Sequence, residues 1–581
     1  MNNGFYLGNE LIAYAAKVMG ASSFYAYPGT PSSELLSSFQ KFAPERYAQW
    51  AVNEKLAMEL SVAAAISGSV SVCAMKQVGL NVAADPLFSA AYTGVSGALV
   101  IISADDPGPH SSQTEQDSRM YAYSAKIPVF DPSSPADAFE LTKKAFAISK
   151  KYGIPVMVRP VMRVCHSRQT FNLPNDAEPP KHGKFVKDMA RWAATPKHRA
   201  ELHLNLISKL NEIGEDVFSD FSIRAKNKFA IVASGYPAAV FADMYDSFKN
   251  DVDFLKIDMP YPIPAEIISK IENSYEKILV LEETFPVIER TFVNRSKVFG
   301  KDTHTVISAG EFTADECKKS LCLFLGRELI QDSSFQFDNI PMALKPRLCA
   351  GCGHRSAFFA IKRAAPSGIF PGDIGCYTLG TNLKAVDTCL CMGASITFAE
   401  SLKRENPQRP VICTIGDSTF FHTGIPALLN AKINDAPIVV AILDNETTAM
   451  TGFQPVPHAQ GKVSLEQVVN GLGIKHLAVS DPYNTKTSVE LLKNALSFAE
   501  KENTPAVVIL RRECVTKTKL KLNPPPKIIP GCTDCGMCYE VFECPAIFFN
   551  GESAEIDGSA CNGCLSCIDL CPRGVIKEAE K

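Results

Sequence analysis

The chain has 581 residues, of which 46% are hydrophobic, and its formal net charge is −3. This length exceeds what one hydrophobic core supports, so we expect four or five domains, while the near-neutral charge gives no support for a nucleic-acid or anionic-membrane partner. The first residues do not resemble a signal peptide and no apolar run is long enough to span a bilayer, so we expect a cytoplasmic protein.

The first polar motif follows a short predicted strand. Residues 27–34 read YPGTPSSE and open a helix, and a second apolar segment leads to Asn53, Glu54 and Lys55 at another predicted helix start. A carboxylate in the first turn of a helix is favoured by the helix dipole. Glu54 taken alone therefore has a structural explanation, and a functional one requires further motifs.

The residue composition changes twice in the middle of the chain. Residues 166–225 are polar and rich in Lys, Pro and Asn, which favours a linker or insert. Strand-like runs separated by helices then predict an α/β domain over residues 226–326. Residues 327–347 and 517–529 read as linkers, and the second is a stiff proline-rich arm.

Residues 409–451 predict a βαβ unit. The strand PVICTI runs into a turn at Gly416 and Asp417, and the strand PIVVAIL ends just before Asn445. Because parallel strands end at one edge of a sheet, we expect Asp417 and Asn445 to lie close together. Gly416 permits close approach by a phosphate, and carboxylate and amide oxygens suit Mg²⁺. The alternative is an ordinary α/β domain with a Gly-Asp turn.

The last fifty residues hold eight of the nineteen cysteines. The second run ends in Cys571-Pro572 and has the spacing C-x2-C-x2-C-x3-C-P of bacterial two-cluster ferredoxins, in which the fourth cysteine ligates the cluster of the other run. In the first run, five residues rather than three separate Cys538 from Cys544. We predict two [4Fe-4S] sites: Cys532, Cys535, Cys538 and Cys571 in one, and Cys544, Cys561, Cys564 and Cys567 in the other.

Two alternatives exist for these cysteines, a zinc ribbon and a disulfide framework. Zinc sites built from C-x2-C pairs rarely need eight cysteines in so short a stretch. The cysteines elsewhere in the chain are scattered, which suits a reducing compartment rather than a disulfide-bonded protein. Iron-sulfur clusters are therefore the favoured interpretation.

Taken together, the motifs resemble the 2-oxoacid:ferredoxin oxidoreductase superfamily, and within it the large (alpha) subunits of the indolepyruvate ferredoxin oxidoreductases. The resemblance covers nearly the whole chain. It rests on the strings YPGTPSSE, NEK, GLNVAADPL, ADDPGPHSSQTEQDSR, CAGCGH, DIGCYTLG, DTCLCMGASI, GDSTFFHTGIPALLNA and LDNETTAMTG.

This resemblance implies an α/β, multidomain protein with thiamine-diphosphate-binding folds. A transketolase C-terminal-like domain would lie between them, and a C-terminal α+β ferredoxin domain of the bacterial 2[4Fe-4S] type would follow. The implied domains are a pyrimidine-binding domain at 1–165, the transketolase-like domain at 226–326, a diphosphate- and Mg-binding domain at 348–516, and the ferredoxin domain at 530–581.

For the diphosphate, the family motif GDG followed by NN stands here as GDS and DN. Carried over by position, Asp417 and Asn445 become side-chain ligands of Mg²⁺ and Thr447 a backbone-carbonyl ligand. Gly416 and Ser418 belong to the same cofactor-binding turn.

For the thiamine ring and the substrate, the resemblance implies two residues near the N-terminus. Glu54 matches the family's activating glutamate, which hydrogen-bonds the aminopyrimidine of the cofactor. Thr30 matches the threonine near the substrate carboxyl group.

A third set of cysteines resembles the ligands of a proximal cluster in this superfamily. Such a cluster would connect the thiamine to the ferredoxin domain. The alternatives for this set are free buried cysteines or a zinc site that includes His354. Two other cysteines, Cys389 and Cys391, are expected to pack in the core. The four cysteines of this set are Cys349, Cys352, Cys376 and Cys514.

The implied reaction is the oxidative decarboxylation of aryl pyruvates, such as indolepyruvate and phenylpyruvate, to aryl-acetyl-CoA. Thiamine diphosphate, Mg²⁺ and the [4Fe-4S] clusters would be cofactors, CoA a co-substrate and an external ferredoxin the acceptor. The small domain of the superfamily has no counterpart here, which implies a small beta subunit in an α2β2 assembly. The alternatives are the same chemistry on pyruvate or 2-oxoglutarate, and a non-catalytic iron-sulfur electron-transfer subunit.

The clues to the substrate are few. The resemblance implies that pyruvate enzymes carry an asparagine at the position of Met450 and an arginine within residues 104–106, where this chain reads ADD. His110, Arg119 and His422 are candidates for substrate contacts or proton transfer. The alternative for these three is hydrogen bonding at a domain interface.

Overall fold

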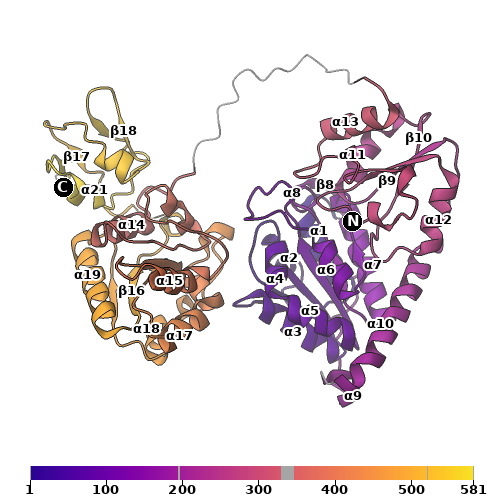
Figure 1. Cartoon of the computed structure of the whole chain (residues 1–581), viewed down its shortest axis with the longest axis horizontal. Coiled ribbons are helices and arrows are strands. Elements are labelled where there is room, and N and C mark those ends of the chain that lie inside the picture. The colour runs from indigo at the N-terminus through magenta and orange to yellow at the C-terminus, as the bar shows by residue number, and fades with distance from the viewer. Residues whose placement is uncertain (1, 194–195, 329–345, 520, 580–581) are drawn as a thin grey trace. The chain divides into compact units, whose positions relative to one another are not determined.

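The computed structural model describes residues 2–193, 196–328, 346–519 and 521–579. The chain forms two compact units, and the boundary between them falls within residues 329–345, outside the described residues. Most of the linker predicted at 327–347 lies in that same stretch. We call the two parts the N-terminal unit and the C-terminal unit (Figure 1).

The N-terminal unit begins with a six-stranded parallel sheet in the order β3-β2-β4-β5-β7-β6. The central strands β4 and β5 are buried at every position, as expected when helices cover both faces. The strands are β2 (Ser23–Ala26), β3 (Tyr47–Trp50), β4 (Val70–Lys76), β5 (Ala98–Ala104), β6 (Val129–Phe130) and β7 (Val156–Val158).

Helices line both faces of this sheet (Figure 1). They are α1 (Gly8–Val18), α2 (Glu34–Phe42), α3 (Glu54–Ile66), α4 (Gln77–Val82), α5 (Ala84–Thr93), α6 (Ser118–Ala125), α7 (Pro135–Tyr152) and α8 (Met162–His166). Outside the sheet, β1 (Asn2–Leu7) pairs antiparallel with β8 (Arg168–Leu173).

Residues 166–225 contain more than a connecting segment. They include β8, the short helix α9 (Met189–Trp192) and the 22-residue helix α10 (Pro196–Val217). Leu206, Leu210 and Ile213 of α10 are buried, and Leu206 and Ile213 belong to the main core of the unit.

A second parallel sheet completes the N-terminal unit, in the order β10-β9-β11-β12. Its strands are β9 (Phe229–Ala233), β10 (Val252–Lys256), β11 (Lys277–Leu281) and β12 (Val298–Phe299). Its helices are α11 (Tyr236–Met244), α12 (Ala265–Ser274) and α13 (Ala314–Leu325).

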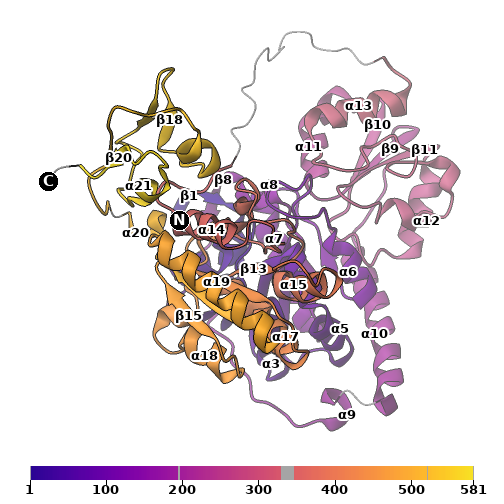
Figure 2. The same ribbon diagram turned by 60° about the vertical axis from the view of Figure 1, so that its left-hand side comes forward.

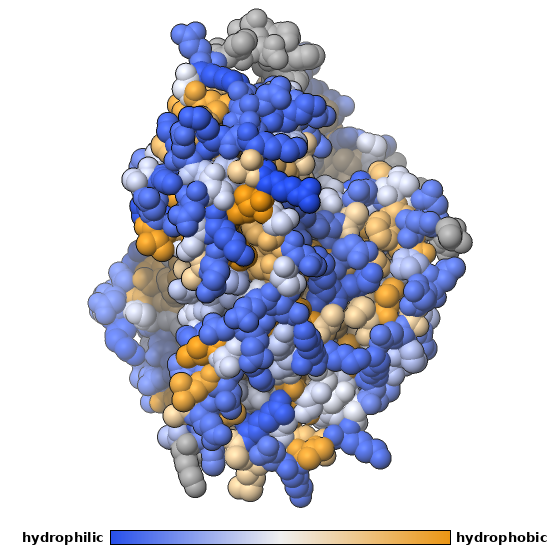
Figure 3. All heavy atoms as spheres, turned by 90° about the vertical axis from the view of Figure 1, so that its right-hand side faces the viewer, coloured by the Kyte–Doolittle hydropathy of each residue, from blue (hydrophilic) through white to orange (hydrophobic). Residues whose placement is uncertain are grey.

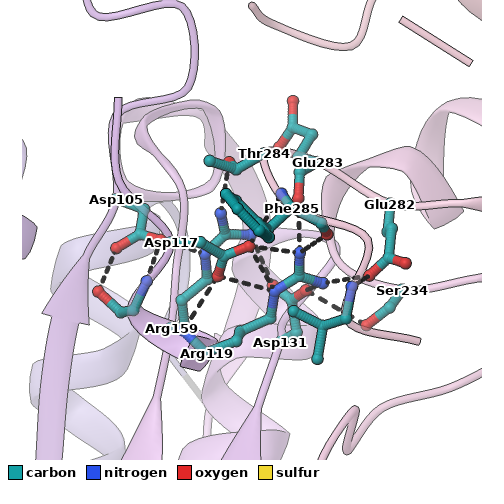
Figure 4. Close-up of polar contacts among 12 residues, drawn as sticks. Asp105, Asp117, Arg119, Asp131, Arg159, Ser234, Glu282, Glu283, Thr284 and Phe285 are labelled. Carbon is teal, nitrogen blue, oxygen red and sulfur yellow. Dashed lines mark hydrogen bonds and ion pairs between the residues drawn. The ribbon is translucent and has the colours of Figure 1, made fainter. Parts of the chain in front are cut away.

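A buried charge cluster joins the two sheets of this unit (Figure 4). Arg119 of α6 donates to Asp117 at 2.7 Å and to Glu282, just after β11, at 3.0 Å. Arg159, just after β7, donates from Nε to Asp105 at 2.6 Å. Both arginines are fully buried, so their charges must be paired within the protein. Of the two sequence interpretations of Arg119, the structure supports the domain interface.

The C-terminal unit contains a four-stranded parallel sheet in the order β13-β14-β16-β15 (Figure 2). Val439, Ala441 and Leu443 of β14 pack with α14 and α19, whereas the alternate residues face α15, α17 and α18. Because side chains alternate along the strand, helices cover both faces of the sheet. The elements are β13 (Ile412–Gly416), β14 (Val439–Asp444), β15 (Leu477–Ser480), β16 (Ala506–Arg511), α14 (Gly353–Ala364), α15 (Ala394–Glu405), α16 (Asp417–Thr419), α17 (Ile425–Ile433), α18 (Leu465–Gly471), α19 (Thr485–Glu502) and α20 (Val515–Thr518).

The cysteine-rich end of the chain, residues 521–579, forms two small antiparallel pairs. They are β17 (Lys527–Ile528) with β20 (Ile576–Lys577), and β18 (Ile547–Phe549) with β19 (Ala554–Ile556). Helix α21 (Ser566–Leu570) lies between β19 and β20 in the sequence. The small core of this segment includes Phe359 of α14, so the segment packs on that helix.

The face of the molecule in Figure 3 is mainly hydrophilic, with apolar residues scattered over it. Scattered apolar residues are normal on a protein surface. Among the described residues, every helix is too short or too polar to cross a bilayer.

Candidate functional site

The loops after β13 and β14 meet at one edge of the C-terminal sheet. Asp417 follows β13 directly, and its Oδ2 accepts a hydrogen bond from the backbone N–H of Glu446 at 2.9 Å. Asn445 lies between β14 and Glu446, and its Oδ1 accepts from the N–H of Thr447 at 3.3 Å. Asp417, Asn445 and Thr447 are all buried. The structure therefore brings together the three residues that the sequence assigns to Mg²⁺.

Two residues absent from that assignment stand at the same place. Asp417, Asp444 and His458 offer ligand atoms that all lie within 4.8 Å of one another. Burial and the neighbouring Asp444 carboxylate raise the pKa of Asp417 to about 7. Burial opposes the ionisation of Asp444, but hydrogen bonds from His458 at 2.9 Å and Arg511 at 2.6 Å lower its pKa to about 2. Two carboxylates held this close favour a divalent cation.

Gly416 has a structural reason that the sequence did not reveal. A Cβ at this position would lie 2.3 Å from the ring of Tyr377. The Tyr377 hydroxyl donates to the carbonyl of Ile374 at 2.6 Å and lies 2.6 Å from the Thr419 hydroxyl. The aromatic ring therefore fills the space beside the turn, and the phosphate explanation for Gly416 stays a prediction.

His354 is the least satisfied polar side chain near this edge. It is buried at the start of α14, and neither ring nitrogen has a hydrogen-bond partner among the described residues. Burial lowers its pKa to about 4, although Asp417 and Asp444 act in the opposite direction. A neutral imidazole with unmet hydrogen-bonding groups fits a polar ligand such as a diphosphate.

The third cysteine set lines a single cavity of about 190 Å³. Asn445 and His354 line the same cavity, so the cysteines adjoin the edge that holds Asp417. Burial raises the pKa of Cys376 to about 12, which keeps this thiol protonated until a metal displaces the proton. The cavity-lining cysteines are Cys349, Cys352, Cys376 and Cys514.

The cysteines of the C-terminal segment also fall into the two predicted sets. One cavity is lined by Cys532, Cys535, Cys538 and Cys571, so Cys571 does cross to the first run. Cys567 interacts electrostatically with Cys564, Cys544 and Cys561.

Local backbone structure accommodates the five-residue spacer between Cys538 and Cys544. A π-helical turn spans Met537–Val541, and the N–H of Cys544 donates to the carbonyl of Cys538 at 3.2 Å. The two extra residues are thus absorbed in a wider helical turn, and Cys544 is left near the cysteines of the second run.

Spacing between the sulfur atoms bears on the zinc alternative. Four thiolates around one zinc ion have sulfurs about 3.8 Å apart, because each Zn–S bond is about 2.3 Å. Among the described residues, ligand atoms of Asp417, Asp444 and His458 all lie within 4.8 Å of one another, whereas no three cysteine sulfurs lie that close together. The cysteine sets are thus wider than a single ion requires, which favours a multinuclear cluster.

Glu54 and Thr30 belong to the N-terminal unit. Glu54 is buried in the first turn of α3, which Asn53 caps by accepting from the N–H of Leu56 at 2.9 Å. Gly79 of α4 makes room for the carboxylate, since a Cβ there would lie 2.5 Å from Glu54 Oε1. The Thr30 carbonyl accepts from the Ser111 hydroxyl at 3.3 Å.

Comparisons with known proteins identify the family of the chain. A family described as pyruvate flavodoxin/ferredoxin oxidoreductase, thiamine diP-bdg, matches residues 14–210. A second, thiamine pyrophosphate enzyme, C-terminal TPP binding domain, matches residues 373–510. Indolepyruvate oxidoreductase subunit IorA of Thermococcus kodakarensis is 37% identical over 97% of this chain and 95% of its own length. Subunit IorA of Archaeoglobus fulgidus is 35% identical over 99% of this chain and 97% of its own.

The chain belongs to the indolepyruvate oxidoreductase subunit IorA family. This confirms the family resemblance seen in the sequence. The α/β folds with thiamine-binding domains are confirmed as well, one in each unit. A weaker similarity, 24% identity over 47% of this chain and 86% of the relative, links this chain to 2-oxoglutarate synthase subunit KorA of Archaeoglobus fulgidus.

Sequence reasoning missed one polar group near Thr30. Lys76, at the end of β4, is buried, and its Nζ donates to the Ser111 carbonyl at 2.6 Å. Burial lowers the pKa of Lys76 to about 8, opposed by Asp106. The only sequence signal was a lysine in the last position of an apolar strand.

One expectation about the remaining cysteines is wrong. Cys391 is exposed, in a bend just before α15, rather than packed in the core. Cys389 is half-buried and donates to the carbonyl of Asp373 at 3.4 Å. The stretch DTCLCMGAS is apolar in composition, but it turns back to begin α15 and so exposes part of its length.

Proposed function

We propose that this chain is the large subunit of a complex that oxidatively decarboxylates indolepyruvate and related aryl pyruvates to aryl-acetyl-CoA. The observation that carries the proposal is the cavity that Cys376 and Cys514 share with Asn445 and His354. It sets ligands for an electron acceptor beside the edge that suits thiamine diphosphate. Membership of the IorA family supports the substrate class.

Thiamine diphosphate, when bound, supplies the carbanion chemistry needed to release CO₂ from a 2-oxoacid. In the C-terminal unit, Asp417, Asn445 and the Thr447 carbonyl would hold Mg²⁺, and His354 would hydrogen-bond the diphosphate. In the N-terminal unit, Glu54 would bind the aminopyrimidine, and Thr30 would lie near the substrate carboxyl group. The buried carboxylates and the unmet nitrogens of His354 fit these assignments.

The three cysteine sets would each hold one [4Fe-4S] cluster, a one-electron carrier. The set of Cys349, Cys352, Cys376 and Cys514 would adjoin the thiamine site. The ferredoxin domain at 530–581 would carry the other two. Two of the sets each line one cavity, and the spacing of the sulfur atoms supports this assignment over single-ion sites.

The relatives are named as subunits, which supports a second, smaller chain in the complex. We infer an α2β2 assembly that uses CoA as a co-substrate and an external ferredoxin as the electron acceptor. The domain boundaries given above are part of the same proposal.

The decisive experiment is anaerobic viologen reduction by this chain purified with its small subunit. Indolepyruvate, phenylpyruvate, pyruvate and 2-oxoglutarate are compared, each with and without CoA. We expect CoA-dependent reduction with the two aryl acids.

Activity on 2-oxoglutarate or pyruvate alone would keep the chemistry and overturn the substrate, and the similarity to the KorA subunit makes 2-oxoglutarate the sharper comparison. Loss of all activity, despite bound thiamine and full iron content, would instead indicate an electron-transfer subunit without catalysis.

A further inference from the structure

Arg355 of α14 occupies an unusual position between two cysteine sets. Arg355 is 1% exposed, and within the described part of the chain all of its hydrogen bonds go to backbone carbonyls. On one side, Nη1 donates to the carbonyl of Phe542 at 3.0 Å and to that of Glu543. On the other side, Nη2 donates to the carbonyl of Leu348 and to that of Cys349 at 3.3 Å.

These carbonyls belong to two loops that carry cysteines. Leu348 and Cys349 begin the loop of the Cys349 set, and Phe542 and Glu543 immediately precede Cys544. Burial lowers the pKa of Arg355, and the thiols of Cys544 and Cys352 are the groups that oppose this most strongly. One cation thus lies close to a cysteine of each set. The Glu543 carboxylate also acts on Arg355, and it lies 3.8 Å from Nε of Arg347.

We propose that Arg355 is a positioning residue for electron transfer, a fixed positive charge that ties the Cys349 set to the Cys544 set and raises the reduction potential of both clusters. This inference rests on the proposed function, because it requires clusters at both sets. In each transfer, a cluster held by the Cys349 set would lose one electron and a cluster held by the Cys544 set would gain it. No bond forms or breaks, and the electron leaves through an external one-electron acceptor protein.

The physical reason is charge. Reduction adds a negative charge to a cluster, and a buried cation stabilises that charge more strongly than an exposed one, because little water screens it. A guanidinium also suits this place better than an ammonium, since its planar donors can reach carbonyls of two loops at once.

The packing around Arg355 indicates the order of the clusters. Ser356 of α14 hydrogen-bonds Ser566 at 3.0 Å, beside Cys567, and the ring of Phe359 lies 5.8 Å from that of Phe542. The face of α14 therefore contacts segments that carry Cys544 and Cys567. Because Arg355 and Ser356 contact the backbone beside Cys544 and the side chain beside Cys567, the Cys544 set would be the one to receive electrons from the Cys349 set.

The test is an anaerobic redox titration of the complete complex, followed by electron paramagnetic resonance, for wild type, Arg355→Gln and a control. Arg363→Gln is the matched control, because Arg363 lies on the same helix but is exposed, with its guanidinium over the Phe359 ring. For Arg355→Gln we expect the reduced-to-oxidised ratio of two clusters to fall about tenfold at fixed potential, which is about 59 mV for a one-electron couple. The cluster of the Cys532 set in Arg355→Gln, and all clusters of the Arg363→Gln variant, should titrate like wild type.

Unchanged potentials in an Arg355→Gln variant that retains all its iron would overturn the role of Arg355. Absence of clusters from the wild-type complex would instead overturn the proposed function, so the two failures are distinct. If Arg355→Gln loses iron, the reduction potentials of Arg355→Lys provide the decisive test. This variant keeps the charge, so its potentials should match wild type, and a tenfold fall in the same ratios would contradict the inference.

Discussion

The space for the Glu54 carboxylate depends on Gly79, which has no side chain. Its carboxylate packs against Gly79, where any Cβ would overlap Oε1 at 2.5 Å. The sequence motif identified Glu54 through Asn53-Glu54-Lys55, but nothing in that string pointed to Gly79. The pocket for the carboxylate comes from two helices, α3 and α4, that meet only in the fold.

We expect Glu54→Gln to lower the rate of CoA-dependent viologen reduction by about a hundredfold or more, because removal of a positioned acid-base group costs about that much. Cluster content should not change. Glu59→Gln is the control, since Glu59 lies on the same helix and is half exposed, paired with Lys55. Steady-state kinetics with indolepyruvate provide the measurement, and wild-type turnover by Glu54→Gln would contradict the assignment.

The charge cluster in Figure 4 includes the carboxyl group of Glu283, whose pKa is raised. Burial raises the pKa of Glu283 from 4.5 to about 7, with Asp131 and Glu311 adding to the effect and Arg159 opposing it. Its Oε1 accepts from the N–H of Phe312 at 2.9 Å, a contact that glutamine can keep. The protonated form is thus favoured in the folded chain.

A raised pKa in the folded state means that the contribution of Glu283 to stability is fully present below its unfolded value of about 4.5 and is lost as the pH rises through about 7. The loss is about 3 kcal/mol. We expect Glu283→Gln to exceed wild type in thermal stability at pH 8, with the difference vanishing near pH 5. Glu276→Gln, at an exposed ion pair with Lys228, is the control. Equal melting curves at both pH values for Glu283→Gln and wild type would refute the expectation.

At the scale of elements, α14 concentrates most of the candidate chemistry. It begins just after Cys352, places His354 and Arg355 in its first turn, and packs Phe359 into the core of the C-terminal segment. The CAGCGH motif marked the start of this helix. The next turn, where Phe359 lies, carried no signal in the sequence.

We expect Phe359→Ala to destabilise the packing of residues 521–579 on α14 by about 3 kcal/mol, the usual cost of deleting a buried phenyl ring. Limited proteolysis within the proline-rich arm at 517–529 should accelerate, which gel analysis over time would measure. Phe549→Ala is the control, because Phe549 is 42% exposed on β18. An unchanged cleavage rate in Phe359→Ala would show that other contacts hold the segment.

Helix α10 shows that overall composition does not predict the structure within residues 166–225. Polar residues dominate the stretch, yet Leu206, Leu210 and Ile213 recur at helical spacing and form a buried stripe. A window long enough to detect the period would have predicted a helix. Average polarity reports only that most of its surface faces water.

At the scale of the whole molecule, the two units carry complementary groups. Glu54 and Thr30 belong to the N-terminal unit, whereas Asp417, Asn445 and all three cysteine sets belong to the C-terminal unit. Both family matches concern thiamine, one in each unit.

We expect anaerobic treatment with EDTA to release Mg²⁺ and thiamine diphosphate and to abolish 2-oxoacid oxidation, because in the proposed site Asp417 and Asn445 would hold the ion that binds the diphosphate. The visible absorbance of the clusters should persist, since thiolate ligands hold iron independently of Mg²⁺. Restoring Mg²⁺ and thiamine diphosphate together should restore activity. Loss of cluster absorbance at the same rate as activity would contradict separate sites.

The sequence by itself determined the family, the spacing of the cysteine runs, and the loops of Asp417 and Asn445. These depend on short motifs and on the rule that parallel strands end at one edge, so local order suffices. Only the tertiary structure decided that Asn445 shares a cavity with four cysteines and that Arg119 lies in an interface. It also decided that Arg355 joins two cysteine loops, because Arg355 and Phe542 are 187 positions apart and no local pattern links residues so distant.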